Sequence, residues 1–120
     1  MLITQRYVSP VFLFMDPRFQ KFIELFNEEK FFEAHEVLEL LWREIEGPEK
    51  KFYQGLIQIA AVFVHLQKDN REGAKQLYQK AFQNLFPYGA AHAGLPLAEL
   101  LAKTAQAIEF KTAPPRIKFE

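Results

Sequence analysis

Apolar residues recur at the spacing of an α-helix through almost the whole chain after residue 16. In residues 17–27 they follow an Asp16-Pro17 pair, which has the form of an N-cap and a first helical residue. Similar apolar faces run through three further segments and through a last one that begins at Pro96. Helix-ending or helix-breaking residues separate the segments: Gly47-Pro48, Asp69-Asn70 and Pro87. This pattern predicts helices and no βαβ unit.

The connections between these segments are short, which favours antiparallel neighbours in a bundle. We therefore predict an all-α fold, a single compact bundle of about five helices with a central antiparallel hairpin formed by residues 31–46 and 48–68. The helical domain is expected to cover residues 16–111. Residues 1–15 are predicted to form an N-terminal arm, and residues 112–120 a non-helical C-terminal tail, because two adjacent prolines interrupt any helix there.

Composition excludes some classes of function without identifying one. The 120 residues carry 15 Lys and Arg against 15 Asp and Glu, so the chain has no net positive field to hold a nucleic acid. The longest apolar run, from Gly55 to Val64, is much shorter than a membrane span. The N-terminal segment has only Arg6 as a positive charge and a proline inside its apolar patch, which makes a poor signal peptide. We expect a cytoplasmic protein whose partner is neither a nucleic acid nor a membrane.

Two polar side chains, His35 and Glu39, lie one helical turn apart on the flank of the apolar face of residues 31–46. Trp42 falls almost in line with them. The segment of residues 48–68 is apolar nearly all round from Leu56 to Leu66, which is the pattern of a buried helix. Polar residues nevertheless form a stripe along this second segment: Gln54, Gln58 and His65.

The two segments can be aligned by counting residues from the turn that joins them, at about 1.5 Å of rise per residue. This count places His35 level with Gln58, and Gln54 near the level of Glu39. A buried polar group without a partner costs about 1–3 kcal/mol, so these side chains are expected to face one another. We therefore predict a buried polar seam formed by His35, Glu39, Gln54 and Gln58.

Three stretches of the chain together resemble a known family of helical proteins. They are FNEEKFFEAHEVLELLWR (residues 26–43), FYQGLIQIAAVFVHL (52–66) and DNREGAKQLYQKAFQNL (69–85). With their EAHE-x-x-E-x-x-W and GLIQ runs, they closely resemble the uncharacterised family called domain of unknown function 309. The resemblance covers roughly residues 19–108. It implies a compact all-helical fold and carries no established activity.

The predicted seam has a structural interpretation and a binding interpretation. Hydrogen bonds across it would fix the register of the hairpin, as is usual for buried polar groups. Polar groups that converge in an apolar wall are also typical of a small-molecule pocket. The candidate ligand-binding residues beside His35 and Glu39 are Trp42, Tyr53, Gln54, Gln58 and His65.

An enzyme is the alternative hypothesis. A histidine near two glutamates, as in His35, Glu36 and Glu39, suits acid/base catalysis near neutral pH. The same run is similar to the H-E-x-x-H helix of zinc proteases with a glutamate in place of the second histidine, so His35 and Glu39 are candidate ligands of a divalent metal. No third ligand is evident at their level, and no nucleophile or phosphate loop accompanies them. The sequence therefore names no substrate.

Thirteen phenylalanines are a large aromatic load for a chain of this length, and part of that area is expected to face a partner. Tyr7, Phe12 and Phe14 lie in the predicted arm, and Phe110 and Phe119 flank the proline break. Exposed apolar patches of this kind often mark self-association. We therefore predict a homo-oligomer.

Overall fold

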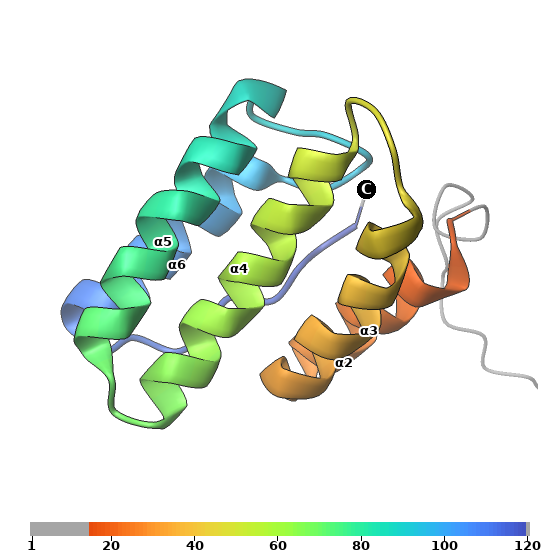
Figure 1. Cartoon of the computed structure of the whole chain (residues 1–120). Coiled ribbons are helices and arrows are strands. Elements are labelled where there is room, and N and C mark those ends of the chain that lie inside the picture. Colours follow the sequence, from red (N-terminus) through yellow and green to blue (C-terminus); the bar gives the residue numbers. More distant parts are fainter. Residues whose placement is uncertain (1–14, 120) are drawn as a thin grey trace, which may run out of the picture.

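The computed structural model describes residues 15–119. In this range the chain forms five α-helices and a short 3-10 helix (Figure 1): α2 (Pro17–Asn27), α3 (Phe31–Glu44), α4 (Lys50–Gln67), α5 (Arg71–Leu85), η1 (Phe86–Tyr88) and α6 (Leu97–Phe110). This arrangement confirms the all-α fold and the central α3–α4 hairpin. None of the helices in residues 15–119 is long and apolar enough to cross a membrane.

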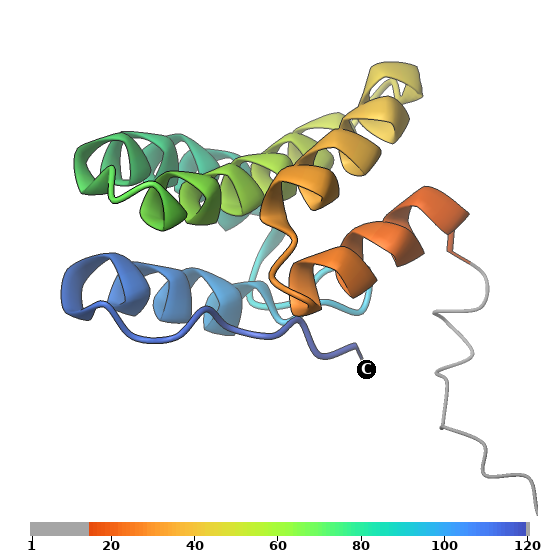
Figure 2. The same ribbon diagram turned by 90° about the horizontal axis from the view of Figure 1, so that it is seen from below.

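The helices stack in two layers. Figure 2 shows α3, α4 and α5 side by side in one layer, with α2, α6 and the C-terminal segment in the other. The middle helix of the first layer is α4, which has a helix on each side and the second layer beneath it. Its remaining face is covered by no helix of the described residues. The position of α4 determines which of its polar residues face neighbouring helices and which face the open side of the layer.

The interior is built around phenylalanine side chains from α2, α3 and α4. The Phe26 ring of α2 contacts those of Phe31 and Phe63 at centroid distances of 5.0 and 5.8 Å, and Phe31 and Phe63 stack at 4.9 Å. Each is at most 1% exposed, and burying such a side chain contributes about 1.5–3 kcal/mol to folding. Further phenylalanines are buried with them: Phe19, Phe22 and Phe52. Much of the aromatic load therefore lies in the core.

The connection between α3 and α4 is longer than predicted. Helix α3 ends at Glu44 because Ile45 has extended backbone angles, and the Lys50 ammonium group donates to the carbonyl oxygens of Trp42 and Ile45 at 2.9 and 3.1 Å. Gly47 adopts a left-handed conformation with φ of 85°, which suits glycine and turns the chain before α4 begins at Lys50. The hairpin helices thus begin or end up to two residues from the predicted bounds of 31–46 and 48–68.

The C-terminal segment is non-helical and packs against the bundle. The side-chain amide of Asn27, the last residue of α2, donates to the Ile117 carbonyl oxygen at 3.0 Å and accepts from its N–H at 2.7 Å. Ile117 is 5% exposed and joins the core. The segment therefore forms part of the second layer rather than a loose tail. The predicted arm of residues 1–15 lies outside the described residues apart from Met15.

Candidate functional site

The two candidate metal ligands on α3 lie close together and are partly exposed. His35 Nε2 and Glu39 Oε2 are 3.6 Å apart, and the side chains are 28% and 32% exposed. Glu39 also accepts from the Arg43 guanidinium at 2.8 Å. Glu36, the third residue of the predicted acid/base group, is exposed on the same helix. The structure therefore brings together His35 and Glu39 as a pair at the surface.

The predicted buried seam of His35, Glu39, Gln54 and Gln58 is wrong as a single network. The side-chain amide oxygen of Gln58 accepts from the side-chain amide of Asn84 in α5 at 2.8 Å. No hydrogen bond within residues 15–119 joins His35 to Gln54 or Gln58, and all four seam residues are only partly buried. Since α4 is the middle helix of its layer, its polar stripe lies toward the open face. Gln58 finds its partner on α5, which the hairpin argument did not consider.

Trp42 lies near the C-terminal end of α3, where Lys50 covers its ring. The Lys50 ammonium nitrogen is 4.5 Å from the ring centroid, a distance that allows a cation–π interaction. The indole nitrogen Nε1 and His35 Nδ1 are both buried and have no hydrogen-bond partner in the structure. Such atoms are destabilising unless ordered water reaches them. These two nitrogens are the main unsatisfied polar groups of the predicted site.

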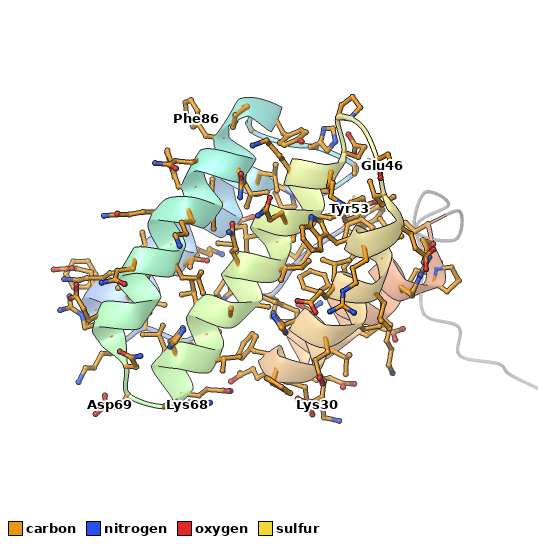
Figure 3. The ribbon with its side chains drawn as sticks, in the orientation of Figure 1. Lys30, Glu46, Tyr53, Lys68, Asp69 and Phe86 are labelled. Carbon is orange, nitrogen blue, oxygen red and sulfur yellow. The ribbon has the colours of Figure 1, made fainter. Side chains whose placement is uncertain are left out.

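The other two candidate ligand-binding residues lie at opposite ends of α4. Tyr53 packs edge-on against the rings of Phe19 and Phe52 at 5.3 and 5.2 Å, and burial raises the pKa of its phenol. His65 lies at the turn into α5, where its Nδ1 is 3.1 Å from the Asn70 amide nitrogen. Figure 3 shows the distance along the bundle between Tyr53 and the Lys68–Asp69 turn that follows His65. The structure therefore does not gather the candidate residues around one ligand.

The metal hypothesis finds two neighbouring ligands on α3 but no complete set. Within residues 15–119, no group of three or more His, Cys, Asp or Glu side chains is placed to hold a metal ion. Protein zinc sites ordinarily use three or four protein ligands. His35 and Glu39 alone fall short of that number.

Sequence analysis missed the role of His92. Its Nε2 lies 2.9 Å from both carboxylate oxygens of Glu49, and its ring packs on Phe52 and Tyr88 at centroid distances of 4.7 and 4.8 Å. The Tyr88 hydroxyl accepts from the Phe52 N–H at 3.0 Å and donates to the Pro48 carbonyl oxygen. These contacts attach the loop after α5 to the first turn of α4. We assign His92 a role in the fold, because it pairs with Glu49 and its ring packs on two aromatic side chains.

The structure also contains a cavity at the C-terminal end of α4, away from Tyr53. Its volume is about 410 Å³, within the roughly 300–1,000 Å³ range of small-molecule sites. It lies near the edge marked by Lys30, Lys68 and Asp69 in Figure 3. Apolar wall residues come from three helices and the C-terminal segment: Phe31, Phe63, Leu66, Ala107, Ile108 and Pro114. Polar side chains complete the lining: Glu29, Gln67, Asp69, Arg71, Lys111 and Thr112.

Three of the lining residues have the left-handed backbone conformation that turns the chain after a helix. They are Glu29 after α2, Asp69 after α4 and Lys111 at the C-cap of α6, with φ of 61°, 57° and 56°. Glycine is the usual residue at such a position, so its sequence signal is missing here. The cavity therefore forms where three helices end, and no local motif marks it.

Part of the chain matches a known protein family. Residues 19–77 fit the family described as a domain of unknown function, DUF309. This part of the chain belongs to that family. The DUF309 match includes the His35–Glu39 pair and the α4 wall of the cavity, but ends before residue 108, to which the resemblance was expected to reach. The α6 and C-terminal walls of the cavity lie outside it.

One relative in Bacillus subtilis (strain 168) is described as the uncharacterised protein YpuF. It is 34% identical to this chain over 65 residues, which make up 52% of this chain and 37% of the relative. The chain thus spans little more than a third of the length of the relative that it matches. Neither the family description nor this name specifies an activity, so a function must be argued from the structure.

Proposed function

We propose that the protein binds a small, mainly apolar molecule in the cavity between the ends of α2, α4 and α6. The observation that carries this proposal is the cavity of about 410 Å³ in a bundle of this size. The cavity is open to solvent between exposed residues such as Glu29 and Lys111, so it is not a void inside the core. A ligand that covers its apolar walls removes them from water, which is favourable by about 25 cal/mol for each Å² of apolar surface buried.

The lining has the composition expected of a ligand site. Phe31 and Phe63 are almost completely buried, so the apolar surface open to a ligand comes from partly exposed lining residues such as Leu66 and Pro114. Polar groups at its edge, such as the Thr112 hydroxyl, can orient a ligand by hydrogen bonding. Gln67 is already positioned by a 3.2 Å hydrogen bond from its side chain to the Glu29 carbonyl oxygen. This combination supports binding.

The proposal can be tested with N-phenyl-1-naphthylamine, a neutral probe whose fluorescence rises in apolar surroundings. We expect saturable binding of one probe per chain. Ala107→Leu places three carbon atoms in the cavity and should weaken probe binding by about tenfold or more. Ala102→Leu, the same change at an exposed position of α6 outside the cavity, is the matched control. Equal binding by both folded variants, or no saturable binding to the wild type, would reject the site.

Self-association is a second candidate function, favoured by two exposed aromatic side chains. The rings of Phe82 and Phe86 stack at 5.2 Å, yet the residues are 39% and 65% exposed. We propose that this pair contacts a second copy of the chain. Light scattering should show an oligomer that Phe82→Ser with Phe86→Ser dissociates, while Phe32→Ser, at an exposed phenylalanine of α3, does not. A monomeric wild type at working concentration would reject this candidate.

The acid/base or metal site predicted at His35, Glu36 and Glu39 stays a prediction. It is supported by the proximity of His35 and Glu39 and by the unpartnered His35 Nδ1. Elemental analysis of the purified protein is its direct test, because stoichiometric metal would favour it over the apolar cavity as the centre of function.

A further inference from the structure

We infer that the cavity selects organic cations, with an ammonium group at its edge and an aliphatic or aromatic body between its apolar walls. The inference rests on the proposed function and adds the charge of the ligand. The negative charge at the cavity comes from carboxylate side chains. The positively charged side chains that line the same cavity, Arg71 and Lys111, oppose this negative charge.

Glu29 and Asp69 both line the cavity, and neither carboxylate forms an ion pair with another side chain of residues 15–119. The positive charge of Arg71 is already engaged. Its Nε donates to the Ile108 carbonyl oxygen at 2.8 Å, and its guanidinium pairs with the Glu109 carboxylate at 2.9 Å. Glu29 and Asp69 are therefore the carboxylates available to a ligand.

The backbone contributes little net potential at the cavity. Helices α2, α4 and α6 end at the cavity, and α3 and α5 begin there, at Phe31 and Arg71. A helix C-terminus acts as about half of a negative elementary charge, and an N-terminus as about half of a positive one. Lys111 brings a positive charge to the cavity, and its position at the end of α6 offsets only part of that charge. The N-termini of α3 and α5 offset the C-termini of α2 and α4, so the preference rests on the two carboxylates against the ammonium group of Lys111. The balance favours a cation over an anion of the same shape.

The ligand class can be tested with three probes that share one apolar chain and differ in charge: hexylammonium, hexan-1-ol and hexanoate. Each is titrated into the wild-type protein, and its Kd is measured from shifts of the backbone amide resonances of Ala107 and Thr112. We expect hexylammonium to bind about tenfold more tightly than hexan-1-ol, and hexanoate more weakly than either. The preference should shrink as salt is added, because these carboxylates are solvent-exposed.

Variants that remove a carboxylate identify the residues responsible for the preference for hexylammonium. Glu29→Gln combined with Asp69→Asn should bring the Kd of hexylammonium to that of hexan-1-ol, while the Kd of the alcohol stays the same. Asparagine tolerates the left-handed backbone at position 69, so this change introduces no strain. Glu28→Gln removes a neighbouring carboxylate that pairs with Lys30 and does not line the cavity, so it should retain the preference.

The probe titrations distinguish failure of the cation preference from failure of the proposed ligand site. Equal binding of all three probes at the cavity, or tighter binding of hexanoate, overturns the inference and leaves the cavity as a ligand site. No binding of any probe overturns both. A cation preference that persists in the Glu29→Gln, Asp69→Asn variant overturns the assignment to these carboxylates.

Discussion

The side-chain amide of Asn27 holds the backbone of Ile117 with two hydrogen bonds, although the residues are separated by 90 positions in the sequence. The carbonyl oxygen of Asn27 is also within 3.3 Å of the Arg116 guanidinium. One residue at the end of α2 thus attaches the C-terminal segment, which supplies Thr112 and Pro114 to the cavity.

Replacing Asn27 with alanine should therefore destabilise the protein. The change leaves the partly buried Ile117 N–H and carbonyl groups without partners, which costs about 1–3 kcal/mol. Urea unfolding measures the loss. Gln79→Ala, at an exposed position of α5, is the control and should stay within about 0.5 kcal/mol of the wild type. If the two variants are equally stable, the C-terminal segment is not held as described.

Gly55 allows α4 and α5 to pack closely. A Cβ atom at this position would lie 2.5 Å from Leu85 Cγ, far inside contact distance. Alanine gains about 1 kcal/mol in helix propensity, but overpacking costs about 1–3 kcal/mol, so we expect Gly55→Ala to be neutral or destabilising in spite of the better helix former. Leu85→Ala alone should cost about 2–5 kcal/mol. Because it also removes the clash, the double variant should lose less than the sum of the two, and simple additivity would contradict this packing.

The helices were predictable because their signals are local. Apolar spacing, the Asp16 cap and the Gly47-Pro48 turn each act within a few residues, and the structure places helices where these signals indicate. The Asp16 carboxylate accepts from the Arg18 N–H at 2.8 Å, as an N-cap should. The two hydrogen bonds between Asn27 and Ile117 have no such local signal, so the packing of the C-terminal segment was not predicted.

The candidate site was predicted less well because its geometry depends on a third helix. Counting residues along a hairpin compares α3 with α4, and it overlooks Asn84 of α5 as a partner for Gln58. The cavity was missed for a related reason. Its walls come from segments as far apart as Phe31 and Pro114, which only the two-layer packing brings together.

Asp16 should make the stability of the protein sensitive to acid. The hydrogen-bonded Arg18 guanidinium holds the pKa of this carboxyl below its usual value in the folded state. A lowered folded pKa adds stability that is fully present above the unfolded value near pH 4 and is lost as the pH falls through the folded pKa. Asp16→Asn keeps a good N-cap but cannot form the ion pair. In urea unfolding, the wild type should have a higher free energy of unfolding than Asp16→Asn at pH 7, and this difference should disappear below about pH 4. A difference that is independent of pH would contradict the prediction.

The hydrogen bond between Gln58 and Asn84 can be distinguished from the originally predicted contact between Gln58 and His35 by double-mutant cycles. The bond at 2.8 Å links two helices and is partly buried, so we expect the coupling free energy between Gln58→Ala and Asn84→Ala to be about 0.5–1.5 kcal/mol. His35→Ala and Gln58→Ala should be additive within about 0.5 kcal/mol, because these side chains share no hydrogen bond. His35→Ala alone should cost less than about 1 kcal/mol, since its ion pair with Glu39 is long and lies at the surface. Strong coupling of His35 to Gln58 would restore the seam, and with it the hypothesis of a functional site on the α3–α4 hairpin.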